Sequence, residues 1–252
     1  MAKHKRGGRD GSGSGRPRFW GRHAVAAALA NPERRITRVW ITHEASGEFQ
    51  FDPTTPLTYA EVADLGRLVP NDAPHQGVVI EVAPLEDMWL GDILTDAPER
   101  ATLLVLDQVT DPHNVGAILR SAAAFGAIGV VTQDRHSPSE GGALAKAASG
   151  ALELIPHVEV RNLAEAIGEL HELGFTTIGL DSEGPLELEN TMSKGRIALV
   201  LGAEGKGLRQ KTRETVNHLA RLDMPGAIKS LNVSNAAAIS LYAAQRFLSS
   251  KD

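Results

Sequence analysis

The sequence contains no cysteine in its 252 residues. Disulfides, thiolate zinc sites, iron–sulfur clusters and cysteine nucleophiles are therefore excluded, and a reducing, cytoplasmic location is expected. Its longest run of apolar and glycine residues, 122–131, is well below the roughly 18 residues that cross a bilayer. No membrane-spanning segment is predicted.

Two common site patterns are also missing. The nine His residues include no His-Glu-x-x-His spacing, so no metal site is predicted. The fingerprint Gly-x-Gly-x-x-Gly is absent and Gly116 stands alone in the relevant turn, which argues against a dinucleotide-dependent dehydrogenase. With 3 Trp, 2 Tyr and 6 Phe, aromatic residues are scarce, and a base-stacking platform of the RNA-recognition-motif kind is not expected.

Positive charge is scarce except at the amino terminus. The formal net charge is −5, yet residues 1–18 contain six Lys and Arg against one Asp, so this segment carries +5 and the remainder −10. A Gly/Ser/Arg segment has little to bury and is predicted to be a disordered basic arm, either a phosphate-binding arm or a solubilising tail. Arg34, Arg35 and Arg38 form a second basic group that we expect to contact phosphates.

The remaining chain divides into two α/β units. Residues 19–83 give short signals, residues 84–100 contain Pro84, Pro98 and five acids and are predicted to be a linker, and residues 101–252 form the second unit. In the first unit and linker we expect helices at 23–29 and near 60–68, strands at 37–42 and 77–83, and a short helix at 88–94.

The second unit alternates short apolar runs with helical segments, which predicts a parallel sheet covered by helices on both faces. We expect strands at 102–106, 129–132, 176–180 and 197–201, and helices at 115–125, 143–149, 163–173 and 233–248. Because ligands of such sheets bind beyond the carboxyl ends of the strands, the loops after Leu106, Leu201 and Leu222 are the places to look for chemistry.

These three loops hold the candidate site residues. Asn114 either caps the helix after the first loop or takes part in chemistry, and Arg120 lies on that helix among alanine and leucine, where a charge persists only if it is paired or faces a cleft. Glu204 lies among three glycines that allow close backbone approach to a ligand. Ser230 and Asn232 precede the last helix, for which Ser234 is the expected N-cap.

Taken together, DPHNVGAILRSAAAFG at 111–126, LVLGAEGKGL at 199–208 and DMPGAIKSLNVSNAAAISLYAAQR at 223–246 resemble the three motifs of the SpoU class of RNA ribose 2′-O-methyltransferases, in the SPOUT superfamily. The segment 19–83, with HAVAAAL and HQGVVIEV, resembles the small L30e/L7Ae-like substrate-binding domain of the ribosomal-RNA members. Members that act on transfer RNA commonly lack this domain, so the resemblance favours a guanosine in 23S ribosomal RNA as the acceptor.

The resemblance implies an α/β methyltransferase domain with a carboxyl-terminal trefoil knot, a homodimer, and S-adenosylmethionine as cofactor. By position, the cofactor contacts fall at Gly202, Leu222 and Leu231. One departure is visible, because family members often have an apolar residue followed by proline where this chain has Leu222 and Asp223.

The resemblance also places five active-site residues, namely Asn114, Arg120, Glu204, Ser230 and Asn232. A guanidinium keeps its proton in proteins, so we assign Arg120 to binding the adjacent phosphate and stabilising charge on the 2′-oxygen rather than to general base catalysis. Asn114 and Glu204 would position Arg120 or the nucleotide, and Ser230 and Asn232 would fix the ribose and loop.

Two alternatives stay open from the sequence. The first is a transfer RNA 2′-O-methyltransferase of the same class, which differs only in the RNA that accepts the methyl group. The second is a non-catalytic RNA-binding factor for ribosome assembly, against which the presence of all five site residues argues.

Overall fold

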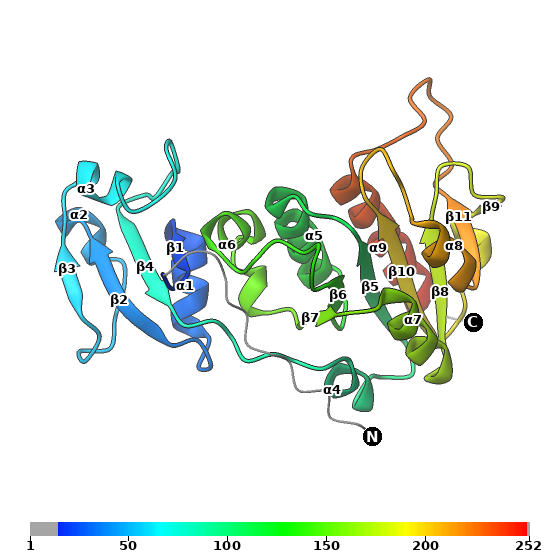
Figure 1. The fold of residues 1–252 in the computed structure, drawn as a ribbon, viewed down its shortest axis with the longest axis horizontal. Coiled ribbons are helices and arrows are strands. Elements are labelled where there is room, and N and C mark those ends of the chain that lie inside the picture. Colours follow the sequence, from blue (N-terminus) through cyan, green and yellow to red (C-terminus); the bar gives the residue numbers. More distant parts are fainter. Residues whose placement is uncertain (1–14, 251–252) are drawn as a thin grey trace.

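The computed structural model describes residues 15–250, which form two sheets joined through an extended segment with one short helix (Figure 1). The first sheet uses residues 18–82 and the second residues 101–221. We call residues 15–83 the small domain and residues 101–250 the large domain. Among the described residues, none of the helices combines the length and apolarity that a bilayer crossing requires.

The small domain contains a four-stranded sheet in the order β1-β4-β2-β3. β4 pairs antiparallel with β1 and β2, while β3 pairs parallel with β2 and forms an edge of the sheet. Its elements are β1 (Arg18–Trp20), α1 (Arg22–Ala30), β2 (Ile36–Ile41), α2 (His43–Ser46), β3 (Leu57–Tyr59), α3 (Val62–Gly66) and β4 (Val78–Val82), followed by α4 (Leu90–Thr95) in the connecting segment.

The large domain contains a parallel sheet of seven strands in the order β7-β6-β5-β10-β8-β11-β9. Its strands are β5 (Ala101–Asp107), β6 (Val130–Gln133), β7 (His157–Val160), β8 (Phe175–Leu180), β9 (Leu186–Glu187), β10 (Arg196–Gly202) and β11 (His218–Arg221). Its helices are α5 (Pro112–Ala124), α6 (Gly142–Ala148), α7 (Leu163–Glu172), α8 (Gln210–Thr215) and α9 (Val233–Ser249), with short 3-10 turns η1 (Ala151–Glu153) and η2 (Leu188–Thr191).

Alternating side chains of the central strands feed two separate apolar layers. Leu104 and Leu106 of β5 join the layer under α5 and α9, whereas Leu103 and Val105 join the layer under α4 and α7. A strand that is apolar on both faces is what a doubly covered parallel sheet requires. The predicted α/β fold with a parallel sheet is therefore confirmed, and the trefoil knot stays a prediction.

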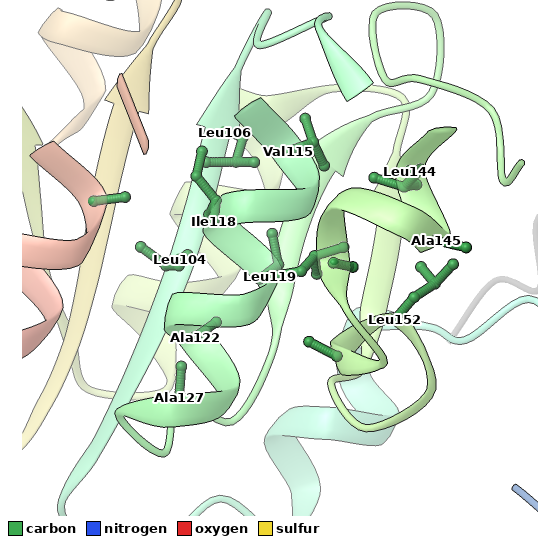
Figure 2. Close-up of a cluster of buried hydrophobic side chains, with 14 of the residues drawn as sticks. Leu104, Leu106, Val115, Ile118, Leu119, Ala122, Ala127, Leu144, Ala145 and Leu152 are labelled. Carbon is green, nitrogen blue, oxygen red and sulfur yellow. The ribbon is translucent and has the colours of Figure 1, made fainter. Parts of the chain in front are cut away.

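Helix α5 is packed on two sides. Figure 2 shows its labelled side chains between those of β5 and those of α6 and η1, and all of them are buried. Gly116 lets α6 approach, because a Cβ there would lie 2.5 Å from the Ala147 side chain and 2.8 Å from the Ala148 backbone nitrogen. The first functional loop therefore leads into a helix held by tight packing.

The two domains share one apolar core and one buried ion-pair cluster. The side chain of Arg34, in the small domain, is fully buried, and its Nε donates to both carboxylate oxygens of Glu153 in the large domain, at 3.0 and 3.1 Å. Its Nη1 donates to the Ala83 carbonyl at 2.9 Å and to the carboxylate of Glu140. Asn31 Nδ2 also donates to Glu153, at 2.7 Å. The expected phosphate contact of Arg34 is therefore wrong, because its charge is used between the domains.

The expected secondary structure is largely present, with two kinds of difference. The strands β1, β3, β7, β9 and β11 and the helices α2 and α8 were not predicted, because each is short and has no continuous apolar run. Arg18, assigned to the basic arm, begins β1 and donates from Nη1 to the Leu68 carbonyl at 3.1 Å, so that arm boundary is too long. Residues 1–14 lie outside the described residues.

Candidate functional site

Four strands of the large domain end at the same edge of the sheet, as parallel strands must. β5 ends at Asp107, β8 at Leu180, β10 at Gly202 and β11 at Arg221. A pocket of about 350 Å³ lies there, within the roughly 300–1,000 Å³ typical of small-molecule sites. Its lining comes from the segments after β8, around and after β10, and before α9, together with Arg213 of α8.

The loop after β10 forms one wall of this pocket. It folds back tightly, since Gly207 N–H donates to the Ala203 carbonyl at 2.8 Å. A Cβ on Gly202 would lie 2.1 Å from the Gly207 carbonyl carbon, so only glycine permits this approach. Gly207 also has a φ of +65°, in the region that favours glycine. The glycines of this motif are therefore required by the path of the backbone.

A buried carboxylate anchors the end of the same loop. Asp107, fully buried at the end of β5, accepts hydrogen bonds from the backbone N–H of Arg209 at 3.0 Å and from its Nε at 2.6 Å. The pair ties the loops after β5 and β10 together. Sequence reasoning missed it because the partners are about a hundred residues apart and neither belongs to a recognisable spacing.

Two of the predicted residues meet directly. Asn232 Nδ2 donates to Asn114 Oδ1 at 3.0 Å, which joins the first turns of α9 and α5. Asn232 Oδ1 also accepts from Ser234 N–H at 2.8 Å, so Asn232 rather than Ser234 is the N-cap of α9. Asp111, and not Asn114, caps α5. The Asn114 amide is therefore left for the contact with Asn232.

The other predicted residues divide into two groups. Gly202, Glu204, Leu222, Ser230 and Leu231 all line the pocket. Figure 1 shows the loop between β11 and α9, which carries Ser230 and Leu231, projecting beyond the edge of the sheet. Arg120 does not line the pocket: it is exposed on α5 and makes no hydrogen bond or ion pair with any described residue.

The pocket also contains residues that the sequence did not indicate. Asp181, Ser182 and Glu183 follow β8 and line the pocket, and the Asp181 carboxylate pairs with Arg213. The signal was a polar run directly after an apolar strand. The three motifs lie in other loops and therefore do not indicate this one.

The chemistry of the lining is mixed. Leu180, Leu201, Leu222, Leu231 and Val233 provide apolar surface. The charged groups are Asp181, Glu183, Glu204, Lys206, Arg213 and Lys229. A ligand that combines a flat apolar part with groups of both charges fits this lining. Within residues 15–250, the His, Asp and Glu side chains form no group of three or more that could hold a metal ion.

Family comparison matches both parts of the chain. Residues 101–242 match the SpoU rRNA Methylase family, and residues 19–88 match the family of RNA 2′-O ribose methyltransferase substrate-binding domains.

Two similar proteins share one description. The chain is 37% identical over 243 residues to the 23S rRNA (guanosine-2′-O-)-methyltransferase RlmB of Pseudomonas syringae, covering 93% of this chain and 97% of that protein. It is 39% identical over 237 residues to RlmB of Ralstonia nicotianae, covering 90% and 94%.

Solved structures show the same fold over nearly the whole chain. The SpoU methyltransferase AviRb from Streptomyces viridochromogenes superposes with a TM-score of 0.79 at 22% identity, covering 93% of this chain and 90% of that chain. The AdoMet-bound rRNA methyltransferase from Sinorhizobium meliloti superposes with a TM-score of 0.76 at 23% identity, covering 93% and 88%.

Proposed function

Because the chain belongs to the SpoU rRNA methylase family, it is a methyltransferase, and we propose that it methylates a guanosine ribose 2′-oxygen in 23S ribosomal RNA. The observation that carries the proposal is the pocket at the sheet edge, which residues of the second and third motifs line, together with the Asn114–Asn232 hydrogen bond that links the first motif to the third. The full-length likeness to proteins named as acting on 23S rRNA supports this substrate.

The cofactor we propose is S-adenosylmethionine, whose parts match the lining of the pocket. The leucines offer apolar surface to a purine, carboxylates offer acceptors to ribose hydroxyls, and Lys229 offers a cation to a carboxylate. The backbones of Gly202 and Gly207 lie close together in the wall of the pocket, and a side chain on Gly202 would clash with the Gly207 backbone. When bound, S-adenosylmethionine supplies an electrophilic methyl group. Gly202, Leu222 and Leu231 would hold it.

Arg120 is the residue we propose to act on the RNA. Its exposure and lack of a partner among the described residues leave the planar guanidinium available to a phosphate. Five fixed N–H donors can hold a phosphate and stabilise negative charge on the attacking oxygen. The 2′-hydroxyl proton then leaves to phosphate or water.

The remaining residues would position the reactants. The Asn114–Asn232 hydrogen bond fixes the first turn of α5 relative to α9, so it sets where the loop that carries Ser230 ends. Glu204 and Ser230 line the pocket and would orient the ribose. Such positioning contributes to rate because reactants held in line lose little further freedom at the transition state.

We propose a homodimer in which α5 and α9 contribute to the interface. Ile239 and Tyr242 of α9 are exposed, and the Tyr242 ring packs edge-on against Phe125, the residue after α5, at 5.9 Å between centroids. An exposed apolar face beside the proposed catalytic Arg120 is suited to a second copy. Ribosomal RNA as substrate would also place the protein in the cytoplasm of a bacterium.

The proposed function is tested with methyl-labelled S-adenosylmethionine and unmodified 23S rRNA, with bulk transfer RNA as a parallel acceptor. We expect label in a nuclease-resistant dinucleotide whose 5′ residue is a guanosine of 23S rRNA. Label only in transfer RNA would contradict the substrate, and RNA binding without label would contradict the activity.

A further inference from the structure

A second pocket lies in the small domain. Figure 1 shows α2 and β3, which border it, at the end of the molecule away from the large domain. It has a volume of about 290 Å³ and lies between α2, the edge strand β3 and the loop that joins them. Phe49, Phe51, Leu57 and Tyr59 line it together with Asp52. None of these residues takes part in the site described above.

The pocket concentrates the scarce aromatic residues of the chain. The rings of Phe49 and Phe51 lie 5.9 Å apart between centroids. The Tyr59 ring stacks on His43 at 4.1 Å with an angle of 6° between the planes, yet Tyr59 remains 52% exposed. His43 therefore supports one face of Tyr59 while the rest of the ring is open to a ligand. A low total of aromatic residues does not exclude a local stacking surface.

Asp52 gives the pocket its polar specificity. Its Oδ1 accepts hydrogen bonds from the Thr54 hydroxyl at 2.7 Å and from the Thr54 N–H at 2.8 Å. These bonds lower the pKa of the Asp52 carboxyl below its ordinary value, so it is ionised at neutral pH. Its Oδ2 accepts no hydrogen bond from any described residue. An ionised acceptor beside aromatic rings suits a flat ligand with N–H donors on its edge.

The surrounding charge distinguishes a base within RNA from a free nucleotide. The sequence segment that lines the pocket contains or adjoins three acidic residues, Glu44, Glu48 and Asp52. Arg22 forms an ion pair with Glu48 at 2.8 Å, so its charge is already compensated. Phosphates bound directly beside the pocket would be repelled. In an RNA chain the phosphates can instead contact Arg35 and Arg38, which are exposed before and on the neighbouring strand β2.

We infer that this pocket binds an unstacked base of the RNA substrate, with the base stacked against the aromatic side chains and its N–H edge on Asp52. The inference rests on the proposed function and adds a contact site remote from the methylated nucleotide. Unpaired bases that stack on aromatic rings and bond through their Watson–Crick edge are the usual targets of sequence-specific RNA recognition. Guanine, with two adjacent donors on that edge, is the base that best suits Asp52.

The test compares the full-length wild-type protein with Tyr59→Ala, Tyr59→Phe and Asp52→Asn, in methyl transfer to an unmodified 23S rRNA transcript. Stacking on an aromatic residue predicts that Tyr59→Ala raises the KM for RNA by about 5- to 100-fold. We expect kcat at saturating RNA and the affinity for S-adenosylmethionine to stay unchanged, and Tyr59→Phe to behave like wild type. Val62→Ala, at an exposed position of α3 in the same domain, is the matched control.

A footprint identifies the base directly. Kethoxal reacts with the Watson–Crick edge of unpaired guanines, so we expect one guanine, distinct from the methylated residue, to be protected by wild type and exposed with Tyr59→Ala and Asp52→Asn. Normal methylation with a KM and footprint insensitive to Tyr59 would overturn this inference alone. Protection that depends on Tyr59 without any methylation would overturn only the proposed function. If the wild-type protein gives no methylation and protects no guanine, both the inference and the proposed function are overturned.

Discussion

Replacing Arg34 with methionine tests how the two domains are held together. The change removes the cation but keeps an unbranched side chain of similar length. It leaves Glu153, whose side chain is 3% exposed, and Glu140, 24% exposed, facing each other without compensation. Removing one partner of a buried ion pair typically costs about 3–5 kcal/mol, because the remaining charge stays buried.

We therefore expect the free energy of unfolding, measured by urea denaturation at neutral pH, to fall by about 3–5 kcal/mol in Arg34→Met. The matched control is Arg35→Met, at an exposed neighbouring position, which should change it by less than about 0.5 kcal/mol. Adding Glu153→Gln to Arg34→Met should restore part of the loss, because it removes one of the two uncompensated carboxylates.

The deficit should also depend on pH. Burial raises the pKa of Glu140 above its ordinary 4.5, and the Arg34 guanidinium opposes this rise. A raised pKa in the folded state means that folding takes up a proton between pH 4.5 and that value, so stability is gained as pH falls through this window and lost as pH rises through it. Without Arg34 the rise is larger, so the deficit of Arg34→Met should shrink at mildly acidic pH. A deficit below about 1 kcal/mol, or one independent of pH, would refute this account.

Three further outcomes follow from the site. Arg120→Lys keeps the charge but loses the planar fork, so we expect kcat to fall about 100-fold or more while calorimetry shows unchanged cofactor affinity; near-normal turnover would exclude the proposed role. Gly202→Ala would push a Cβ into the Gly207 backbone and should weaken S-adenosylmethionine binding at least about 10-fold, whereas Gly168→Ala, where no atom lies within 4 Å, should leave it unchanged. Deleting residues 1–14, which leaves strand β1 intact, removes four cations. The plot of log affinity for RNA against log salt concentration should then become less steep by about 3. An unchanged slope would show that the arm does not bind phosphate.

The parts of the fold that the sequence predicts are those decided locally. Strand β10 has a continuous apolar run and helix α5 has apolar residues at helical spacing, and both are found within a few residues of the predicted bounds. The strand order is not local, since β10 lies between β5 and β8, and it depends on which loops can pack. The short strands β9 and β11 gain their hydrogen bonds only once the sheet has formed.

Arg34 shows why charge patterns mislead. In the sequence it is one of two adjacent arginines and suggests an exposed basic surface. Its partner Glu153 lies 119 residues further on, so nothing nearby in the chain indicates the pair. The same reason hides Asp107 and Arg209, 102 residues apart. By contrast, the residues of the glycine loop were identifiable because the backbone path itself demands glycine.

The position of α6 explains how the two sites that we propose for RNA can act together. One side of α6 packs on α5, which carries Asn114 and Arg120, and the other side packs on β1 of the small domain. The Trp20 ring lies directly over Gly142, where a Cβ would be 1.7 Å from it, and Lys146 Nζ donates to Gln76 Oε1 at 2.7 Å. Phe19 of β1 and Leu144 and Ala145 of α6 also belong to the apolar core that lies beneath α5. Because packed cores resist deformation, the spacing between the aromatic pocket and the methyl-transfer site is set by the protein and not by a flexible linker. An RNA that meets both sites must therefore present an unpaired base at one fixed separation from the acceptor ribose, which supplies selectivity that neither site has alone.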